Sequence, residues 1–479
     1  MIIIAEKVKN TIRSKLREKI EEISKELGSK PLEEILKGKS YVEKMLNAEE
    51  KEKTVLLESV KKLFEEADKI YAELAERKAK YHINGKESRK VVTIFGELKY
   101  ERNYYVSKEK AKEYFYFVDE FFKIEAYARY DRIVKGKAIE KAIKHNQKRA
   151  GELLGEEIES TKKHTSFCDI PRQTIHRWIK EWEIPEVKYA PKEHGKELFV
   201  MVDEKYIHEQ VKQNLKKPEK KRNFIMGKAF VAFTRIEEKD KRRTLCNRFV
   251  FLTSERSAWN KFMDTICQVY DFEKIKKISV LSDAAKWIIS GIGELRLYEQ
   301  NAVVSCLCEF HFKQKINRIT TDSEIKKALI SCVQNNQKAV FKNEMEKIKH
   351  EKPHRLEKLN EYEKYILGNW AKIHSMKASK YKSSMEAQIS HHIANTFSSR
   401  PKAYSRNRIE SYLKLQEYSS NGIDVFNLYL KTCDNFKRKI YSQEELDFSI
   451  FEDSQTSVFP IIQKGLYTGA FNLLKNLTH

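Results

Sequence analysis

Apolar residues recur every three or four positions near the start of the chain, which predicts an amphipathic helix. The pattern stops at Gly28 and Pro31, two residue types that commonly end helices. Helical spacing continues to about residue 80, so we interpret residues 1–85 as a helical region with a packing or oligomerising role. The apolar positions of the first helix are Val8, Ile12, Leu16, Ile20, Ile23 and Leu27.

A β-hairpin is predicted after this helical region. Residues 90–106, "KVVTIFGELKYERNYYV", place β-branched and aromatic residues on both sides of Phe95-Gly96-Glu97. Such a run is typical of two strands that turn at the glycine. We interpret residues 86–130 as a small β-containing module, within which helical spacing resumes from about residue 108.

The stretch "FCDIPRQTIHRWIKEW", residues 167–182, has the spacing of an amphipathic helix with a basic face. Its apolar residues Ile175, Trp178, Ile179 and Trp182 lie at i, i+3, i+4 and i+7. With the preceding "QKRAGELLG" it predicts a helix-turn-helix within residues 131–185, whose second helix would enter a DNA major groove. The alternative is an ordinary amphipathic helix. The candidate DNA-binding residues are Arg172, Gln173, His176, Arg177 and Lys180.

Strand patterns dominate after a linker at residues 183–197, which contains two prolines and a glycine. Three strands are expected first, followed by a helix, a strand, a helix and a strand. A meander followed by β-α-β elements is the order that a ribonuclease H-like fold requires. The expected strands span 197–209, 223–237, 244–253, 277–283 and 301–308, and the helices span 256–270 and 284–296.

The expected fold class is therefore an α/β catalytic core with a ribonuclease H-like mixed sheet, preceded by a mainly helical DNA-binding region. A charged helical pattern without a convincing strand interrupts this core and predicts an all-helical insertion. We divide the second half of the chain into the first part of the core (186–311), the insertion (312–380), the catalytic helix that completes the core (381–420) and a C-terminal helical tail (421–479).

Three carboxylates fall on the expected elements of the core. Asp203 lies within the first strand, Asp283 ends the fourth strand, and Glu386 opens a later helix. A single acid at a strand end is more often a cap or a turn residue. Three converging carboxylates, however, repel one another unless cations neutralise them, and oxygen ligands suit Mg²⁺ or Mn²⁺. Two such ions can assist both oxygens of an in-line displacement at a phosphodiester.

The charge balance points to the same class of substrate. The 479 residues include 93 Lys and Arg against 70 Asp and Glu, a formal charge of +23. This excess favours a polyanionic partner, nucleic acid above all, over a basic protein with scattered lysines. Seven cysteines without framework spacing indicate a reducing compartment, and no apolar run approaches the ~20 residues of a membrane span. We expect a cytoplasmic protein with no membrane contact.

Four segments resemble, in order, the motifs of the ISLre-type family of prokaryotic insertion-sequence DDE transposases: "MVDEKYIHEQ", "LSDAAKWI", "CEFHFKQKI" and "EAQISHHIANTFSSRPKAYS". The resemblance runs from about residue 90 to 420, and "VTIFGELKYERNYY" and "IPRQTIHRWIK" are similar to the family's N-terminal segment. It implies Asp203, Asp283 and Glu386 as the catalytic triad that binds two Mg²⁺ or Mn²⁺ ions. Cys308 and His311 resemble the family's C/D-x2-H signature, in which many members have Asp at the first position.

Other residues near these motifs have candidate roles. His311 could touch a phosphate close to the metal site, whereas zinc binding by Cys308 and His311 lacks a second pair of ligands. Trp287 is interpreted as a core residue rather than one that stacks on a flipped base. The loop 212–222 carries six basic residues, a solvated turn or a DNA contact. Residues expected to contact DNA phosphates after the catalytic helix are Arg400, Lys402, Arg406 and Arg408.

We therefore expect a DDE transposase, a polynucleotidyl transferase of DNA transposition and recombination that nicks a mobile element's ends and joins the freed 3′-OH to target DNA. Its partners would be double-stranded DNA, as terminal inverted repeats and target, and further copies of itself in a homodimer or larger assembly. The resemblance implies a nucleoid-associated location in a prokaryotic cell. The alternatives are a ribonuclease H-like nuclease or resolvase that cuts without joining, and a domesticated, non-catalytic DNA-binding regulator.

Overall fold

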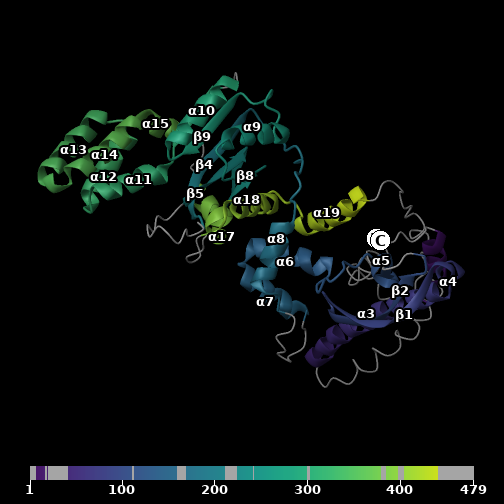
Figure 1. The fold of residues 1–479 in the computed structure, drawn as a ribbon. Helices are drawn as coiled ribbons and strands as arrows, with labels where there is room; N and C mark the ends of the chain where they lie inside the picture. Colours follow the sequence, from purple (N-terminus) through teal and green to yellow (C-terminus); the bar gives the residue numbers. More distant parts are fainter. Residues whose placement is uncertain are drawn as a thin grey trace, which may run out of the picture. The chain divides into compact units, whose positions relative to one another are not determined.

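The computed structural model describes residues 7–16, 19, 41–109, 113–158, 169–210, 224–240, 242–298, 302–378, 384–397 and 404–440. Backbone contacts divide the chain into two compact units, and Figure 1 labels the elements of both. The first unit comprises residues 1–181 and 426–479, and the second comprises residues 182–425. None of the described helices is both long and apolar enough to span a membrane.

A three-stranded antiparallel sheet, in the order β1-β2-β3, lies at the centre of the first unit. Its hairpin confirms the predicted turn: Thr93 pairs with Gly96, which has a φ of +127° that favours glycine. The helix expected from about residue 108 is wrong at its start, because residues 114–116 form a strand on β2. The elements are a helix over 7–16, α3 (Tyr41–Glu73), α4 (Ala75–Lys80), β1 (Tyr81–Thr93), β2 (Gly96–Ser107), β3 (Tyr114–Tyr116) and α5 (Phe117–Phe121).

The N-terminal helices and this sheet share one hydrophobic core. Phe64 of α3 contacts Tyr100 of β2 edge to face, with 5.0 Å between the ring centres. Tyr71 stacks on Phe117, with 4.1 Å between the ring centres. The apolar stripe of α3 is therefore covered by the sheet, and the helical region and the β-module fold on each other.

Four helices complete the first unit: α6 (Arg132–Lys144), α7 (Gln147–Ile158), α8 (Arg172–Glu181) and α19 (Val425–Ile440). Glycines allow the chain to pack closely against α7. A methyl group at Gly151 would lie 2.1 Å from the carbonyl oxygen of Ile170, and one at Gly155 would lie 2.7 Å from Asp169 Oδ1. The segment that leads into α8 therefore lies directly on α7.

The second unit is built on a five-stranded mixed sheet in the order β10-β9-β4-β5-β8. β4, β9 and β10 run parallel, whereas β5 is antiparallel to both of its neighbours, β4 and β8. The carboxyl ends of β4 and β9 therefore point toward the same end of the sheet. The strands are β4 (Glu197–His208), β5 (Phe224–Phe233), β8 (Phe249–Thr253), β9 (Lys277–Ser282) and β10 (Ala302–Leu307).

The second and third strands of this sheet are shorter than the sequence predicted. A separate hairpin, β6 (Arg235–Lys239) and β7 (Arg242–Cys246), lies between them. Asp240 and Asn247 have φ values of 50° and 51°, a left-handed conformation that Asp and Asn tolerate better than most residues. The chain turns at these two positions, and the strand pattern is divided there.

Helices cover both faces of the sheet. On one face, α9 (Ala258–Val269) and α10 (Lys286–Tyr298) pack on Leu198, Val200 and Val202 of β4. On the other face lies the helical segment of Glu386, which begins with α16 (Met385–Ile389). The Ser384 amide that precedes α16 lies 3.4 Å from Met201 Sδ of β4.

The described residues between β10 and the segment of Glu386 are helical. They have their own core, which includes Phe312, Phe341 and Trp370, and Figure 1 shows these helices gathered at one side of the sheet. The elements are α11 (Glu309–Ile319), α12 (Ser323–Gln334), α13 (Lys338–Glu351), η1 (Pro353–Arg355), α14 (Leu356–Gly368) and α15 (Trp370–Ala378).

Helix α18 (Arg406–Ser420) seals the edge strand β8 with polar side chains. The backbone N–H of Leu252 donates to Glu417 Oε2 at 2.8 Å, and that of Ser254 donates to Glu410 Oε2 at 2.7 Å. Asn421 bonds both the N–H and the carbonyl oxygen of Val250, at 2.8 and 2.7 Å. An edge strand exposes unpaired backbone groups, and here side chains satisfy them in place of another strand.

Candidate metal centre

Two neighbouring parallel strands, β4 and β9, position the first carboxylates. Asp203 of β4 is buried, and its Oδ1 accepts a hydrogen bond from the Glu204 backbone N–H at 2.8 Å. Asp283 directly follows β9, and its Oδ1 accepts from the Ala285 N–H at 2.8 Å. Ala284 between them has a φ of 64°, a conformation that costs a non-glycine residue of order 1 kcal/mol or more. The turn after β9 is thus strained where it presents Asp283.

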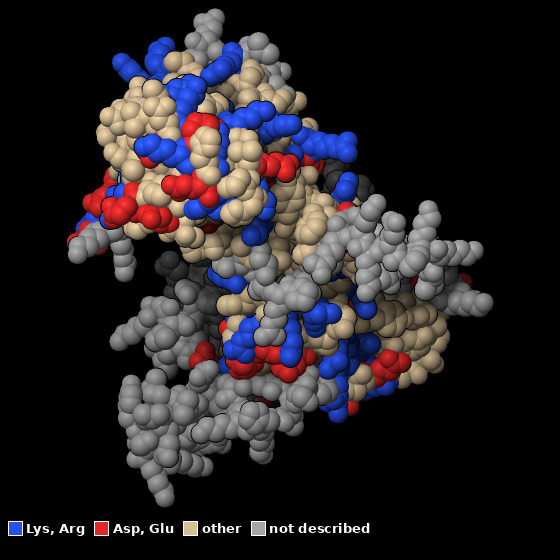
Figure 2. All heavy atoms as spheres, turned by 90° about the vertical axis from the view of Figure 1, so that its left-hand side faces the viewer, with Lys and Arg blue, Asp and Glu red and all other residues tan. Residues whose placement is uncertain are grey.

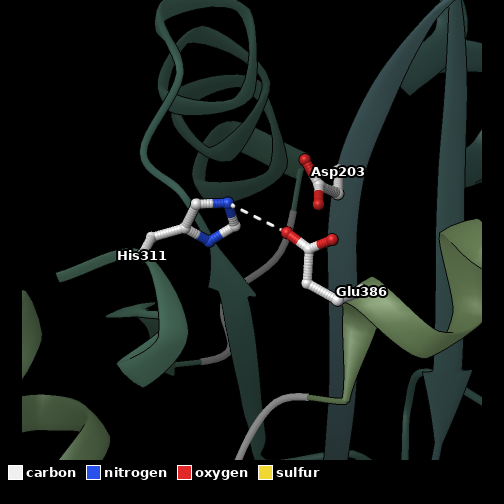
Figure 3. A group of neighbouring side chains, drawn as sticks. All are labelled: Asp203, His311 and Glu386. Atoms are coloured by element: carbon white, nitrogen blue, oxygen red, sulfur yellow. Dashed lines mark ion pairs between the residues drawn. The ribbon is translucent and has the colours of Figure 1, made fainter. Parts of the chain in front are cut away.

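The acid on the later helix meets Asp203 and a histidine. Ligand atoms of Asp203, His311 and Glu386 all lie within 4.8 Å of one another. Figure 3 shows the His311 ring, from the first turn of α11, and the Glu386 carboxylate pointing toward each other beside Asp203. Nε2 of His311 lies 3.5 Å from Glu386 Oε1, and the Glu386 side chain is 50% exposed.

A second group overlaps with the first. Ligand atoms of Asp203, Glu204 and Asp283 also lie within 4.8 Å of one another, so Asp203 belongs to both groups. Asp283 and Glu386 do not share a group, although each of them is grouped with Asp203. Both sets consist of groups that could hold a metal ion, and neither set found among the described residues contains a cysteine.

Glu204 is a site residue that the sequence interpretation did not assign. Its Oε2 accepts a hydrogen bond from Trp287 Nε1 at 2.7 Å, and Lys228 lies opposite it on β5. Nζ of Lys228 lies 5.2 Å from the centre of the Trp287 ring. The adjacent pair Asp203-Glu204 near the end of an apolar strand was the available signal. Alternation along a strand predicts that adjacent side chains lie on opposite faces, yet the ligand atoms of Asp203 and Glu204 lie within 4.8 Å of each other.

Burial sets the electrostatics of the acids. It is the largest cause that raises the pKa of Asp203, and the carboxylates of Asp283, Glu204 and Glu386 raise it as well, whereas the Glu204 backbone hydrogen bond lowers it. The combined effect is a pKa of about 7. Burial also raises the pKa of Glu204, although its bond from Trp287 favours the charged form. A bound cation would remove this penalty, because it stabilises the charged carboxylates.

His311 is held by the residue at the start of its own helix. Burial alone would lower the pKa of His311, but its hydrogen bond with Cys308 and the carboxylates of Asp283 and Glu386 raise it above the usual value. Cys308 is buried at the N-terminus of α11, and its backbone N–H donates to Ser282 O at 2.8 Å. The Cys308-x2-His311 pair therefore fixes the start of α11 beside the end of β9.

The residues expected to contact DNA are placed as follows. On α8, Ile175 and Ile179 are buried, Arg172, Gln173, Arg177 and Lys180 are exposed, and His176 is half-buried. Residues 159–168, which connect α7 to the segment before α8, lie outside the described residues. Arg406 Nε lies 3.5 Å from Glu209 Oε1. Arg400, Lys402 and the basic loop 212–222 lie outside the described residues.

The described surface carries both signs of charge. Figure 2 shows one face of the molecule, on which Lys and Arg side chains are interspersed with Asp and Glu.

These features define a mixed α/β protein with a carboxylate cluster, on β4 and directly after β9, that could hold metal ions. Residues 7–431 match the uncharacterised protein family UPF0236, and the chain belongs to this family. No solved structure matches the chain.

Its similar proteins include several from Caldanaerobacter subterraneus subsp. tengcongensis, all named as UPF0236 proteins. One, whose name carries eleven locus designations, is 28% identical over 77% of this chain and 75% of its own length. Another is 28% identical over 81% of this chain and 80% of its own length.

Proposed function

We propose that this protein is a DDE-type transposase, a metal-dependent polynucleotidyl transferase that cuts DNA at the ends of an insertion sequence and joins them to target DNA. The observation that carries the proposal is the pair of overlapping ligand groups that share Asp203, on the central strand of a mixed sheet. Shared carboxylates of this kind suit two neighbouring divalent cations.

The sheet topology supports the proposal. Its three-stranded antiparallel part is followed in sequence by two parallel strands on the other side of β4, the order that a ribonuclease H-like core requires. The insertion enters between β10 and the segment of Glu386, where the DDE resemblance also expects it.

The donor set fits Mg²⁺ or Mn²⁺. Carboxylate oxygens suit these ions, whereas an imidazole nitrogen suits later transition metals better. We therefore assign Asp203 and Glu386 to one ion and Asp203, Glu204 and Asp283 to the other. Bound cations would supply Lewis acidity for an in-line displacement at a phosphodiester.

His311 would act beside the ions rather than as their ligand. Its raised pKa favours a proton on the ring, and Nε2 faces Glu386. In this role it orients the Glu386 carboxylate, and the same N–H could donate to a phosphate oxygen of the DNA backbone.

The relatives' names add support of another kind. One relative carries eleven locus designations and another carries four, both in one organism. Many loci for one protein are what a copying or moving element would leave in a genome. Insertion-sequence transposition accounts for such multiplicity, whereas a housekeeping enzyme does not require it.

DNA binding is assigned to the first unit. The exposed basic residues of α8, on a helix that buries Ile175 and Ile179 against its neighbours, resemble a recognition helix. The target would be double-stranded terminal inverted repeats, and a homodimer or larger assembly would hold two ends together.

Two other functions deserve tests. A ribonuclease H-like nuclease or resolvase would use the same carboxylates but leave its cut ends unjoined. A non-catalytic DNA-binding regulator would have no use for them. The presence of all the residues of the two ligand groups, Asp203, Glu204, Asp283, His311 and Glu386, favours an enzyme over the regulator.

The decisive experiment is strand transfer. A labelled, pre-nicked DNA fragment that carries the ends of the native element is incubated with plasmid DNA, Mg²⁺ or Mn²⁺, and native protein or Glu386→Gln. Joined products that depend on Glu386 are expected. Cutting without joining would favour the nuclease, and DNA binding without chemistry in the native protein would favour the regulator.

A further inference from the structure

The helical segment that carries Glu386 is not a uniform α-helix. A π-helix at Ser390–Ala394 separates α16 from α17 (Asn395–Phe397). Its buried apolar residues Met385, Ile389, Ile393 and Phe397 recur every four residues. In an α-helix of 3.6 residues per turn, three such steps would rotate the apolar stripe by about 120° away from the core. The wider π turn takes up this excess, so both ends of the stripe remain buried.

His392 lies within this π turn and connects it in two directions. Its ring is buried, with Nδ1 2.8 Å from Ser420 Oγ and Nε2 3.0 Å from the Gln388 side-chain amide. The single hydroxyl proton of Ser420 is donated to Gln416 O at 2.7 Å. The Ser420 oxygen must therefore accept from His392 Nδ1–H.

The rest of the proton arrangement follows from the charge of the ring. Burial, together with the smaller effects of Arg248 and His391, lowers the pKa of His392 to about 4, so the ring is neutral at pH 7. A neutral ring that donates from Nδ1 accepts at Nε2. The Gln388 amide then presents its NH₂ group, which a 180° rotation of that amide provides.

Both partners of His392 matter for Glu386. Gln388 lies two residues after Glu386 in α16. Ser420 is the last residue of α18. Its neighbours Glu417 and Asn421 accept hydrogen bonds from backbone N–H groups of the edge strand β8, and the Ser420 carbonyl oxygen accepts one from Arg248 Nη2 at 3.2 Å. The ring thus links the five-residue helix of Glu386 to a helix anchored on β8.

We propose that His392 is a positioning residue for Glu386: through Gln388 and Ser420 it fixes the rotation of α16, so that the half-exposed Glu386 carboxylate stays beside Asp203 and His311. This inference rests on the proposed function, because it requires Glu386 to be a metal ligand. Packing of its own exposed side chain does not hold Glu386 in place.

The test measures Mn²⁺ affinity of the full chain by electron paramagnetic resonance, together with the melting temperature. His392→Leu fills the buried space but removes both hydrogen bonds, and should weaken Mn²⁺ binding about 10- to 100-fold, as loss of a residue that supports a ligand commonly does. His392→Asn retains a donor near the position of Nδ1 and should recover most of the affinity. The matched control is His391→Asn, at the exposed neighbouring position, which should bind as the native chain does.

Further variants make the result independent of whether His392→Leu folds. Gln388→Ala and Ser420→Ala each remove one partner from a partly exposed position, and each should weaken Mn²⁺ binding with little change in melting temperature. Native affinity in both, or in a folded His392→Leu, would overturn the inference. Asp203→Asn separates this outcome from failure of the metal centre. If Asp203→Asn leaves Mn²⁺ binding unchanged, the proposed centre itself is wrong.

Discussion

Trp287 Nε1 lies 2.7 Å from Glu204 Oε2, so an indole N–H donates directly to a carboxylate of the candidate metal centre. An excited tryptophan can transfer its excitation energy to a lanthanide ion bound a few ångströms away. The molecule therefore contains its own optical reporter for an ion bound by Asp203, Glu204 and Asp283.

We predict that Tb³⁺, an oxygen-binding cation like Mg²⁺, will luminesce when the protein is excited at the tryptophan band. Trp287→Phe should remove most of this luminescence but leave Tb³⁺ bound, as measured by competition with Mn²⁺. Glu204→Gln should instead weaken binding about tenfold or more, because it removes a charged ligand while keeping the hydrogen-bond acceptor. Equal luminescence in native protein and Trp287→Phe would place the ion elsewhere.

The buried Asp203 carboxylate makes the ion-free protein sensitive to pH. Its folded pKa of about 7 exceeds the unfolded value of 3.8, so the folded chain binds the proton more tightly. This contribution to stability is present below about pH 4 and is lost as the pH rises through 7. In EDTA, Asp203→Asn should be more stable than native protein at pH 8, by of order 1–4 kcal/mol, and this advantage should be smaller at pH 5.

Thermal unfolding at both pH values measures this difference, and Mg²⁺ should raise the melting temperature of native protein but not of Asp203→Asn. Activity should be lost in the variant at either pH. A native melting temperature that rises between pH 5 and 8 in EDTA, with Asp203→Asn parallel to it, would contradict the assignment.

Glu417 should be a stability residue of the sheet edge. It is buried, and it accepts hydrogen bonds from the Leu252 N–H and from the Tyr189 hydroxyl. Glu417→Ala would leave the buried Leu252 N–H without its acceptor and would remove one partner of the half-buried Tyr189 hydroxyl, at a cost of about 2–4 kcal/mol in the free energy of unfolding. Glu417→Gln retains an acceptor for Leu252 and an NH₂ group that can bond Tyr189, so it is the matched control. Urea unfolding that fails to separate the two variants would disprove this role.

The basic face of α8 should set the salt dependence of DNA binding. Arg177→Ala and Lys180→Ala each remove an exposed cation, and each should lower affinity for an element-end duplex and reduce the salt slope by about one if it contacts a phosphate. Arg243→Ala is a suitable control, because this exposed arginine of β7 is paired with Glu238 and lies in the other unit. Unchanged salt slopes would remove α8 from the DNA interface.

Much of the α/β unit could be predicted because its strands carry strong apolar patterns. The apolar runs that contain or precede Asp203 and Asp283 identify buried strands by composition alone, and the structure pairs these two strands in parallel. The helical insertion was recognisable for the same reason, as its periodic apolar positions around Phe312 and Phe341 form a separate core.

The remaining differences arise from tertiary context. Tyr114–Tyr116 lies among helix-forming residues and becomes a strand because β2 offers it a pairing partner, with Tyr104 opposite Tyr116. The β6–β7 hairpin depends on left-handed turns at Asp240 and Asn247, which a strand pattern does not reveal. Glu204 escaped assignment because alternation along a strand predicts opposite faces for adjacent residues. The π turn at 390–394 was visible only as an apolar spacing of four.

The contacts that seal β8 also constrain how the chain folds during synthesis. Leu252 and Glu417 are 165 residues apart in sequence, and Val250 and Asn421 are 171 apart. At about 5–20 residues per second, a ribosome needs roughly 8 to 35 seconds to deliver the helix after the strand. During that interval the open strand edge is exposed to other nascent chains. A product truncated before residue 404 would lack α18 altogether, so incomplete copies of this protein should be prone to aggregation.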